Sequence, residues 1–291
     1  MRIARFSHAG EVSYGLVLGA SGTAAEAQAT ANGPGTANGS GSAAQPDHGG
    51  EQLMLAQLAG HPFGGTAADI KLTGLRFPLD EVRLLAPILP SKVICIGKNY
   101  ADHAREMGGE PPADPVIFLK PSTAVCGPGD PIFRPTQLSE RVDYEGELAV
   151  VIGRLCRQVP AERADEVIFG YTCANDVTAR DLQARDGQWT RAKSFDTFCP
   201  LGPWMETDVD PADLQLTTRL NGEVRQDSRT CLLLHDVRAL VVYVSQVMTL
   251  LPGDVLLTGT PAGVGAMDKG DQVSVSIEGI GTLSNPVTDR G

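Results

Sequence analysis

Two glutamates, Glu145 and Glu147, stand two residues apart at the head of the apolar run 148–152. That run predicts a buried strand, and side chains at positions i and i+2 leave a strand on the same face. Two carboxylates that close together repel each other unless a cation or a proton lies between them. The pair is therefore a candidate cation site, although an isolated Glu-x-Glu is also typical of a solvated strand end.

A third carboxylate, Asp176, follows the apolar segment 167–174, which predicts another strand. Asp176 thus stands at a strand end, as the two glutamates do. The next segment, 177–188, predicts a helix that carries Arg180 and Gln183.

A histidine and a glutamate form a second candidate group. The segment 101–107 predicts a helix, and its His103 and Glu106 are three residues apart, on one helix face. A carboxylate that binds an imidazole fixes its tautomer and raises its basicity, as a general base requires. A surface helix pair has the same spacing, so this motif alone leaves both interpretations open.

Several basic and small residues could meet an anionic ligand. Lys98 follows the predicted strand 93–96, and Lys120 ends the predicted strand 116–120. Lys193 lies in an irregular, Gly- and Pro-bounded loop, where a lone lysine is usually solvated. The Gly-rich turn 259–265 offers backbone amides and the Thr260 hydroxyl to an oxyanion, but it lacks the Gly-Lys-Ser/Thr ending of a phosphate loop.

The remaining pattern predicts a small N-terminal module, residues 1–84, and a main domain, residues 85–291. The module opens with a hairpin and continues with an Ala-, Gly- and Ser-rich stretch, about 19–50, which we expect to be a disordered insertion. A short helix is predicted at 51–58. Further predicted elements are a hairpin of 214–220 with 223–226 across Asn221-Gly222, a helix at 240–250, and strands at 255–258, 273–277 and 281–283.

Composition limits the class of protein. An apolar content of 42% over 291 residues suits a packed globular core, and a net charge of −11 argues against binding nucleic acid or an anionic membrane surface. The N-terminus lacks the continuous apolar segment of a signal peptide, so a cytoplasmic protein is expected. The six cysteines are widely spaced, which favours free thiols over disulfides or zinc.

Eight motifs in order together resemble the fumarylacetoacetate hydrolase family. They are GKNYADHAREMG, FLKPST, DYEGELAVVIG, NDVTARDLQ, KSFDTFCPLGP, NGEVRQ, LLPGDVLLTGTPAGVG and GIGTLSNPV. The resemblance spans about residues 84–287. Within the family, the chain is most similar to the bacterial branch of 2-hydroxyhepta-2,4-diene-1,7-dioate isomerases and acylpyruvate hydrolases. The segment 230–235 departs from the family pattern, so we expect it to lie in the core or a dimer interface and His235 to be structural.

The resemblance implies an α+β fold that is mostly β, a distorted antiparallel β-roll with peripheral helices. It also implies that Glu145, Glu147 and Asp176 hold one Mg²⁺, for which Mn²⁺ or Ca²⁺ can substitute. Lys193 would lie near the metal, and Arg180 and Lys98 could help to offset the carboxylate charge. A homodimer is expected.

The same resemblance implies an enzyme acting on small anionic 2-oxo acids. His103, Glu106 and Lys193 would be catalytic, and the substrate contacts would come from Lys98, Tyr100, Lys120, Arg180, Gln183 and Thr260. Hydrolysis of a 2,4-dioxo acid, decarboxylation and isomerisation share an enolate intermediate, so the motifs leave these reactions open. A metal-binding scaffold without catalysis is the alternative from another class.

Overall fold

Strand β11 (Gly146–Ile152), which carries Glu147, lies inside a 12-stranded sheet. This computed structural model describes residues 1–19, 53–63 and 70–290. Ten strands of the sheet form one path; in order along it they are β4 (Leu72–Pro78), β3 (Met54–Leu58), β2 (Glu11–Leu18), β1 (Arg2–His8), β14 (Cys199–Glu206), β12 (Ile168–Asn175), β11, β17 (Val255–Leu257), β6 (Val93–Gly97) and β7 (Val116–Lys120). Two short strands lie off it: β5 (Arg83–Leu85) pairs with β1, and β8 (Val125–Cys126) pairs with β14.

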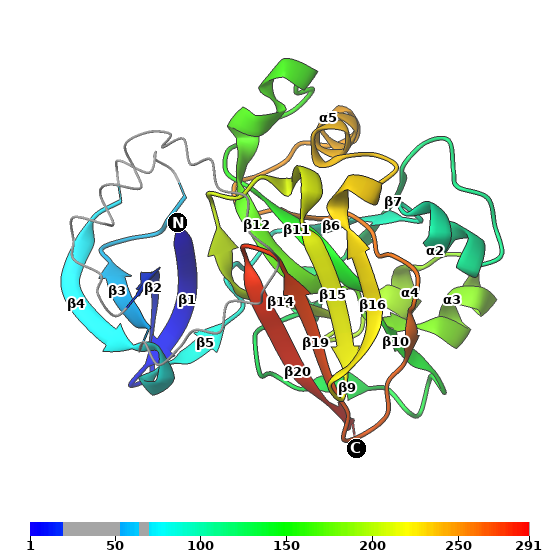
Figure 1. Ribbon diagram of the computed structural model, residues 1–291, viewed down its shortest axis with the longest axis horizontal. Coiled ribbons are helices and arrows are strands. Elements are labelled where there is room, and N and C mark those ends of the chain that lie inside the picture. The colour runs from blue at the N-terminus through cyan, green and yellow to red at the C-terminus, as the bar shows by residue number, and fades with distance from the viewer. Residues whose placement is uncertain (20–52, 64–69, 291) are drawn as a thin grey trace, which may run out of the picture.

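Two smaller sheets complete the β structure. The five-stranded sheet has the order β16 (Glu223–Arg229), β15 (Gln215–Leu220), β19 (Gln272–Ile277), β20 (Gly281–Asp289) and β9 (Ile132–Arg134). The three-stranded sheet has the order β13 (Thr178–Ala179), β10 (Val142–Tyr144) and β18 (Gly265–Ala266). The expected fold, mostly β with peripheral helices, is confirmed (Figure 1).

Both faces of β11 are buried, which explains its unbroken apolar sequence. Leu148, Val150 and Ile152 join a core with residues of the five-stranded sheet. Ala149 and Val151 face the opposite core, which includes residues of β6, β14 and β17. Glu147 shares the face of Ala149 and Val151, because side chains alternate along a strand.

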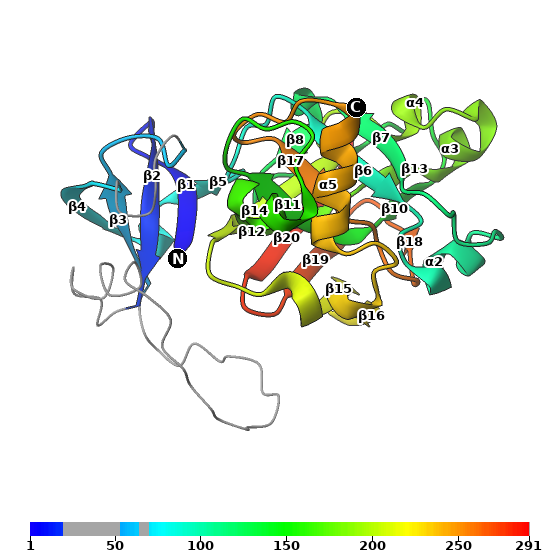
Figure 2. The same ribbon diagram turned by 90° about the horizontal axis from the view of Figure 1, so that it is seen from above.

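The N-terminal strands β1 to β4 lie at one side of the molecule, to the left in both views (Figures 1 and 2). They join the main sheet through the antiparallel pairing of β1 with β14. The predicted first hairpin is confirmed by β1 and β2. The predicted insertion at 19–50 lies, apart from residue 19, outside the described residues.

The helix predicted at 51–58 is wrong, because the described part of that segment is strand β3. This strand pairs with β2 on one side and β4 on the other. Hydrogen bonds to two neighbouring strands, together with burial of Leu55 and Leu58, outweigh the local preference of the segment for helix.

Three short helices lie at the side of the molecule opposite the N-terminal strands (Figures 1 and 2): α2 (Ala101–Glu106), α3 (Arg180–Asp186) and α4 (Thr190–Lys193). Helix α3 is shorter than the predicted 177–188, because the chain first adds strand β13 to β10. The longest described helix, α5 (Val237–Val247), begins three residues before the predicted start, where Asp236 accepts a hydrogen bond from the Ala239 amide. Single 3-10 turns are η2 (Leu79–Glu81), η3 (Ser122–Ala124), η5 (Pro211–Asp213) and η6 (Thr230–Leu232); η4 (Ala161–Val167) is longer.

All six cysteines are free, as predicted, and four are buried. Within the described ranges, no helix is both long and apolar enough to span a bilayer.

The segment 230–235 is not part of the core of this chain, because Cys231, Leu232 and Leu234 are exposed. Its end is fixed instead by Asn99, whose side chain hydrogen-bonds the backbone N–H and C=O of His235.

Gly146 is required by close packing between β11 and the five-stranded sheet. A Cβ at this position would overlap Thr218 Oγ1 and lie 3.2 Å from Gln226 Oε1. We predict that Gly146→Ala lowers the free energy of unfolding by about 1–3 kcal/mol, the usual effect of overpacking a core. Denaturant unfolding measures it.

The matched control is Gly60→Ala, where the new Cβ would meet no described atom within 4 Å. That change should alter the free energy of unfolding by less than about 0.5 kcal/mol. Equal stability of the Gly146→Ala variant and the parent protein would contradict this packing.

Candidate metal and proton-transfer site

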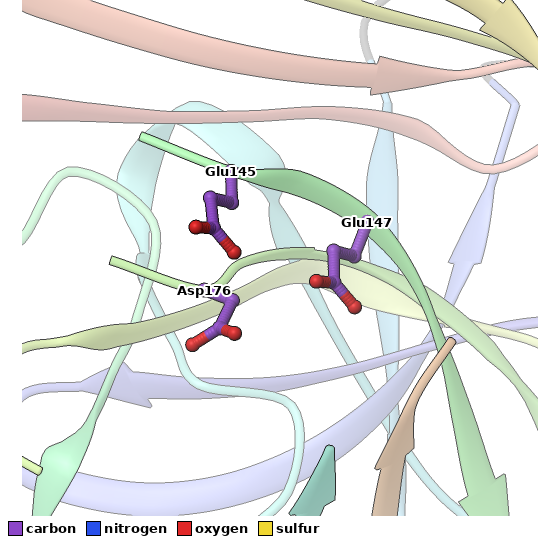
Figure 3. Close-up of side chains that lie close together, drawn as sticks. All are labelled: Glu145, Glu147 and Asp176. Atoms are coloured by element: carbon purple, nitrogen blue, oxygen red, sulfur yellow. The ribbon is translucent and has the colours of Figure 1, made fainter. Parts of the chain in front are cut away.

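Three carboxylates meet at the end of β11. Glu145 and Glu147 flank Gly146, and Asp176 directly follows β12, the strand paired with β11. One oxygen of each lies within 4.8 Å of the others, and all three residues are at most 4% exposed. Figure 3 shows the three side chains directed into the same space. The structure therefore brings together the three predicted metal ligands.

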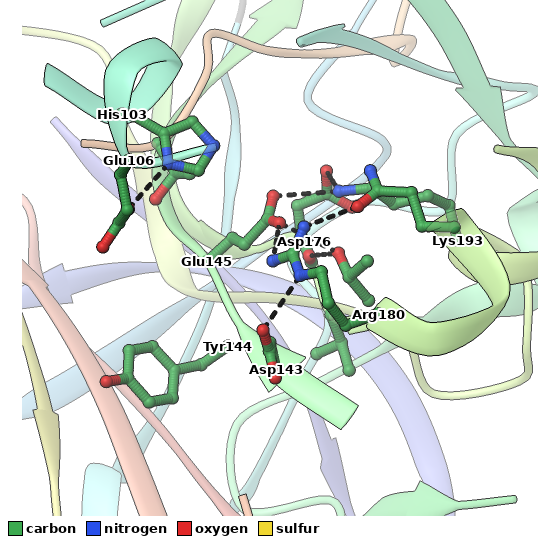
Figure 4. Close-up of polar contacts among 12 residues, drawn as sticks. His103, Glu106, Asp143, Tyr144, Glu145, Asp176, Arg180 and Lys193 are labelled. Atoms are coloured by element: carbon green, nitrogen blue, oxygen red, sulfur yellow. Dashed lines mark hydrogen bonds and ion pairs between the residues drawn. The ribbon is translucent and has the colours of Figure 1, made fainter. Parts of the chain in front are cut away.

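Positively charged side chains surround two of the three carboxylates (Figure 4). Lys193 Nζ lies 2.9 Å from Glu145 Oε2 and 2.6 Å from Asp176 Oδ2. Arg180 donates to Glu145 Oε1 at 2.6 Å, and the fully buried Lys120 ammonium donates to Asp176 Oδ1. Burial opposes ionisation, yet Lys193 and Arg180 hold the pKa of Glu145 well below its usual range.

Glu147 forms no ion pair of this kind. Its Oε2 accepts a hydrogen bond from the Gly259 amide at 2.6 Å, and no cationic side chain among the described residues lies within ion-pair distance. Burial, followed by repulsion from Asp176 and Glu145, raises the pKa of Glu147 well above its ordinary value. A divalent cation beside Glu147 would remove this penalty.

A fourth buried acid, Asp143, lies behind the triad and fixes Arg180. Arg180 Nε donates to Asp143 Oδ2 at 2.9 Å, while its Nη1 donates to Gln183 Oε1 at 2.6 Å. Thr178 adds a hydroxyl donor to Glu145 Oε1 at 3.1 Å. If all four carboxylates were ionised, the three cations Lys120, Lys193 and Arg180 would leave one negative charge in the cluster, before the half-exposed Arg141 beside Asp143 is included.

The predicted pair on α2 is formed. His103 Nδ1 lies 3.1 Å from Glu106 Oε2, and the other oxygen of Glu106 accepts the Gly263 amide at 3.0 Å. Glu106 therefore joins α2 to the Gly-rich turn. A carboxylate at Nδ1 favours the tautomer with the proton on Nδ1, which leaves Nε2 free to accept a proton.

His103 and the three carboxylates line one cavity of about 270 Å³. Its polar lining consists of Lys98, His103, Glu145, Glu147, Asp176, Arg180, Gln183, Lys193 and Thr260, all of which were predicted site residues. Its apolar wall consists of Ile96, Met107, Phe118, Ala184 and Trp189. Lys193 also lies 5.0 Å from the centre of the Phe118 ring, which packs edge-on against Trp189.

Three other predicted site residues do not line this cavity. Glu106 lies behind His103, and Lys120 lies behind Asp176, where it also donates to the Val177 carbonyl at 3.1 Å. Tyr100 is 1% exposed and forms an isolated bridge with Leu233.

Sequence reasoning missed Gln226, which links β11 to the Gly-rich turn. Its Oε1 accepts the Gly146 amide at 2.9 Å, and its Nε2 donates to Thr260 Oγ1 at 2.7 Å and Pro261 O at 2.8 Å. Thr260 in turn donates its hydroxyl proton to the Gly146 carbonyl. Gln226 ends the NGEVRQ motif, but its contacts lie 34 and 80 residues away, beyond any local pattern.

The donor set suits a hard divalent cation. Three carboxylates bind Mg²⁺, Mn²⁺ or Ca²⁺ well and leave coordination positions for water or a chelating ligand. Glu147, which is buried and has no ion-pair partner among the described residues, marks the side of the cluster on which a cation would fit.

Comparisons with known proteins agree with this geometry. Residues 92–288 match the family described as Fumarylacetoacetate (FAA) hydrolase C-terminal, and residues 51–87 match the family described as Rv2993c-like, N-terminal. Protein Rv2993c of Mycobacterium tuberculosis is 60% identical over 243 residues, 82% of this chain and 90% of that protein. The mitochondrial oxaloacetate tautomerase Fahd2a of Rattus norvegicus is 45% identical over 222 residues, 72% of this chain and 71% of that protein.

Two solved structures extend the comparison. That of 5-carboxymethyl-2-hydroxymuconate delta-isomerase from Mycobacterium smegmatis is 51% identical, with a TM-score of 0.82 over all of both chains. That of fumarylpyruvate hydrolase from Pseudomonas aeruginosa, in complex with Mn²⁺ and pyruvate, is 37% identical, with a TM-score of 0.66 over 70% of this chain and 91% of the other. From its sequence motifs, its fold and these relatives, the chain belongs to the fumarylacetoacetate hydrolase family.

Proposed function

We propose that this protein is a Mg²⁺-dependent hydrolase that cleaves a carbon–carbon bond in short 2,4-dioxo acids of the acylpyruvate type. The observation that carries the proposal is the buried carboxylate triad, in which Glu147 has no ion-pair partner among the described residues, in the same cavity as His103, which Glu106 holds. The relative with Mn²⁺ and pyruvate in its structure is a fumarylpyruvate hydrolase, which supports the same chemistry.

Glu145, Glu147 and Asp176 would hold the cation. When bound, it supplies Lewis-acid stabilisation of negative charge on the oxygens of a 2-oxo acid. Lys193 stays an ammonium: burial opposes the charge, but Asp176 and Glu145 raise the pKa of Lys193 above its ordinary value. Its two ion pairs fix the orientation of these carboxylates.

His103 would be the general base. With Glu106 holding Nδ1, Nε2 takes a proton from water, whose oxygen attacks C4 of the substrate. The C3–C4 bond then breaks, its electron pair forms the enolate of pyruvate, and C3 takes up a proton. One water is consumed, and the products are a carboxylic acid and pyruvate.

A second candidate is proton transfer without cleavage, as in tautomerisation or isomerisation of a 2-oxo acid. It is favoured by the relatives named oxaloacetate tautomerase and muconate isomerase, which are more similar to this chain than the hydrolase is. The same base would then remove a proton from C3 to give an enolate. Protonation of the enolate on oxygen would give the tautomer, and protonation on another carbon would give the isomer. Decarboxylation of oxaloacetate would use the same enolate.

Ultraviolet absorbance, pyruvate release and deuterium exchange together distinguish these reactions. Acetylpyruvate or fumarylpyruvate should lose its absorbance with Mg²⁺ present and release one equivalent of pyruvate. Exchange of the C3 hydrogens with deuterated water, without pyruvate release, would reject the hydrolase in favour of the second candidate. Bound metal with neither reaction would leave a non-catalytic metal-binding protein.

Glu147→Gln should remove metal binding and stabilise the metal-free protein at neutral pH. Because the pKa of Glu147 is raised in the folded state, the stability linked to its proton is complete below the unfolded pKa, near 4.5, and is lost as the pH rises through the folded pKa. Metal-free Glu147→Gln should therefore melt above the metal-free parent at pH 8, and the difference should shrink towards pH 4.5.

Mg²⁺ or Mn²⁺ provides the second comparison in the same melting experiment. Cation at about 100 times its Kd stabilises a protein by about 2.7 kcal/mol, and this should raise the Tm of the parent but not of Glu147→Gln. Glu145→Gln, which removes a carboxylate with two cationic partners, should lower the metal-free Tm instead. An equal metal-dependent shift in Glu147→Gln and the parent would contradict the ligand assignment.

His103→Asn should reduce kcat by about 10²- to 10⁴-fold, the usual contribution of a general base, without weakening metal binding. Glu106→Gln should also reduce kcat, because the amide cannot hold the imidazole tautomer as a carboxylate does. Turnover measures the loss, and the metal-dependent Tm shift of each variant shows that the triad is intact. Unchanged kcat in His103→Asn would show that another group is the base.

A further inference from the structure

One residue of the Gly-rich turn, Gly263, contacts the pair formed by His103 and Glu106. Its N–H donates to Glu106 Oε1 at 3.0 Å, while the other oxygen of Glu106 lies 3.1 Å from His103 Nδ1. The Glu106 side chain is 33% exposed, so water competes for its oxygens. The orientation of the carboxylate that holds the imidazole therefore depends on where the Gly263 amide lies.

Glycine by itself leaves the direction of this amide open, because it adopts many backbone conformations at similar energy. The neighbours of Gly263 must select one of them. Its φ is +98°, and a Cβ there would lie only 2.1 Å from the Arg225 carbonyl oxygen of β16. This close approach fixes the Cα of Gly263 on one side. The peptide groups that flank the Cα need a further contact.

Tyr144 supplies that contact from β10, the strand that leads to the carboxylate cluster. Its hydroxyl donates to the Gly263 carbonyl at 3.0 Å. The side chain is 3% exposed, packs among apolar side chains and does not line the cavity. Because side chains alternate along a strand, Tyr144 and Asp143 face opposite ways, and Figure 4 shows the Tyr144 ring directed away from Arg180. The hydroxyl is thus carried by a rigid, buried ring outside the cation cluster.

The chain leaves just enough room for this hydroxyl beside the turn. Tyr144 is paired with Gly265 of β18, and a Cβ on Gly265 would lie 2.8 Å from the Tyr144 hydroxyl oxygen. Gly263 is therefore required by the approach of Arg225, and Gly265 by the approach of Tyr144. Phenylalanine would fill the same space in the core as the tyrosine ring, so what the hydroxyl adds is its bond to Gly263.

The two hydrogen bonds of Gly263 connect Tyr144 to Glu106. The carbonyl and the amide flank one Cα, so a contact that holds the carbonyl also restricts rotation of the amide. Without the hydroxyl, the carbonyl would be free to turn and the amide would lose part of its fixed direction. Glu106 would then hold Nδ1 of the imidazole for a smaller fraction of the time.

We infer that Tyr144 is a positioning residue for proton transfer: through Gly263 it holds Glu106, and through Glu106 it keeps the proton of His103 on Nδ1. This inference rests on the proposed function, in which His103 is the base. Tyr144 lies outside the cavity and is not itself catalytic.

Tyr144→Phe removes only the hydroxyl and should reduce kcat by about 3- to 10-fold, the rate equivalent of one neutral hydrogen bond, with KM within about twofold. The metal-dependent Tm shift should equal that of the parent, because all three carboxylates remain. The matched control is Tyr171→Phe, at another buried tyrosine that does not line the cavity, and it should keep the parent kcat.

A double variant separates positioning from a general structural effect. In Glu106→Ala the Gly263 amide has no carboxylate to hold, so adding Tyr144→Phe should lower kcat by less than about 1.5-fold. If the hydroxyl served only the packing of the core, the two losses would multiply.

The tautomer of His103 tests the inference without turnover. In Mg²⁺-loaded protein with ¹⁵N-labelled histidine, the shifts of the ring nitrogens show which of them carries the proton when the ring is neutral. The His103→Asn variant identifies the His103 signals. The parent should carry the proton on Nδ1, Tyr144→Phe should show a smaller population of this form, and Tyr171→Phe should match the parent.

An unchanged kcat together with unchanged His103 shifts in Tyr144→Phe would overturn the inference. So would an equal fold-loss of kcat when Tyr144→Phe is added to Glu106→Ala. Failure of the proposed function looks different: the metal-loaded parent then turns over no 2-oxo acid, while the His103 shifts still decide whether Tyr144 acts on the pair.

Discussion

Repulsion among three carboxylates is the constraint on which the rest of the site depends. Their oxygens lie within 4.8 Å of one another in a buried place, so the protein must supply positive charge or keep a proton there. Lys193, Lys120 and Arg180 supply it to Glu145 and Asp176 from the outside of the cluster. Glu147 has no ion-pair partner among the described residues, and this asymmetry makes the cluster a candidate site for a divalent cation.

The fold holds these like charges together through rigid surroundings. β11 is buried on both faces, and Gly146 lies so close to the five-stranded sheet that no Cβ fits. The Gln226 side chain hydrogen-bonds both the Gly146 amide and Thr260 and Pro261 of the Gly-rich turn. Two backbone amides of that turn donate hydrogen bonds to Glu147 and Glu106. The Gly-rich turn is therefore a shared support for the candidate metal ligands and for the His103–Glu106 pair. The chemistry depends on the packing of elements that are distant in sequence.

The sequence predicted those parts of the site that depend on local spacing. Alternation along a strand placed Glu145 and Glu147 together, and helical periodicity paired His103 with Glu106. Local spacing could not show that Lys193, predicted to lie in a loop, is buried against Asp176, or that Lys120 approaches from 56 residues away; only the family resemblance placed Lys193 near these carboxylates. Those contacts depend on how β7 and α4, which are far apart in the sequence, pack against each other. The error at 51–58 has the same cause, because β3 is a strand only through its two neighbours.

The most direct test of the account is a crystal structure of the protein with Mn²⁺, in which anomalous scattering locates the cation. We expect a single Mn²⁺ site bonded to oxygens of Glu145, Glu147 and Asp176 at roughly 2.0–2.2 Å, facing the cavity near His103. Absence of an anomalous peak at this cluster at saturating Mn²⁺, or a peak ligated by other residues, would contradict the claim that these three carboxylates form a metal centre.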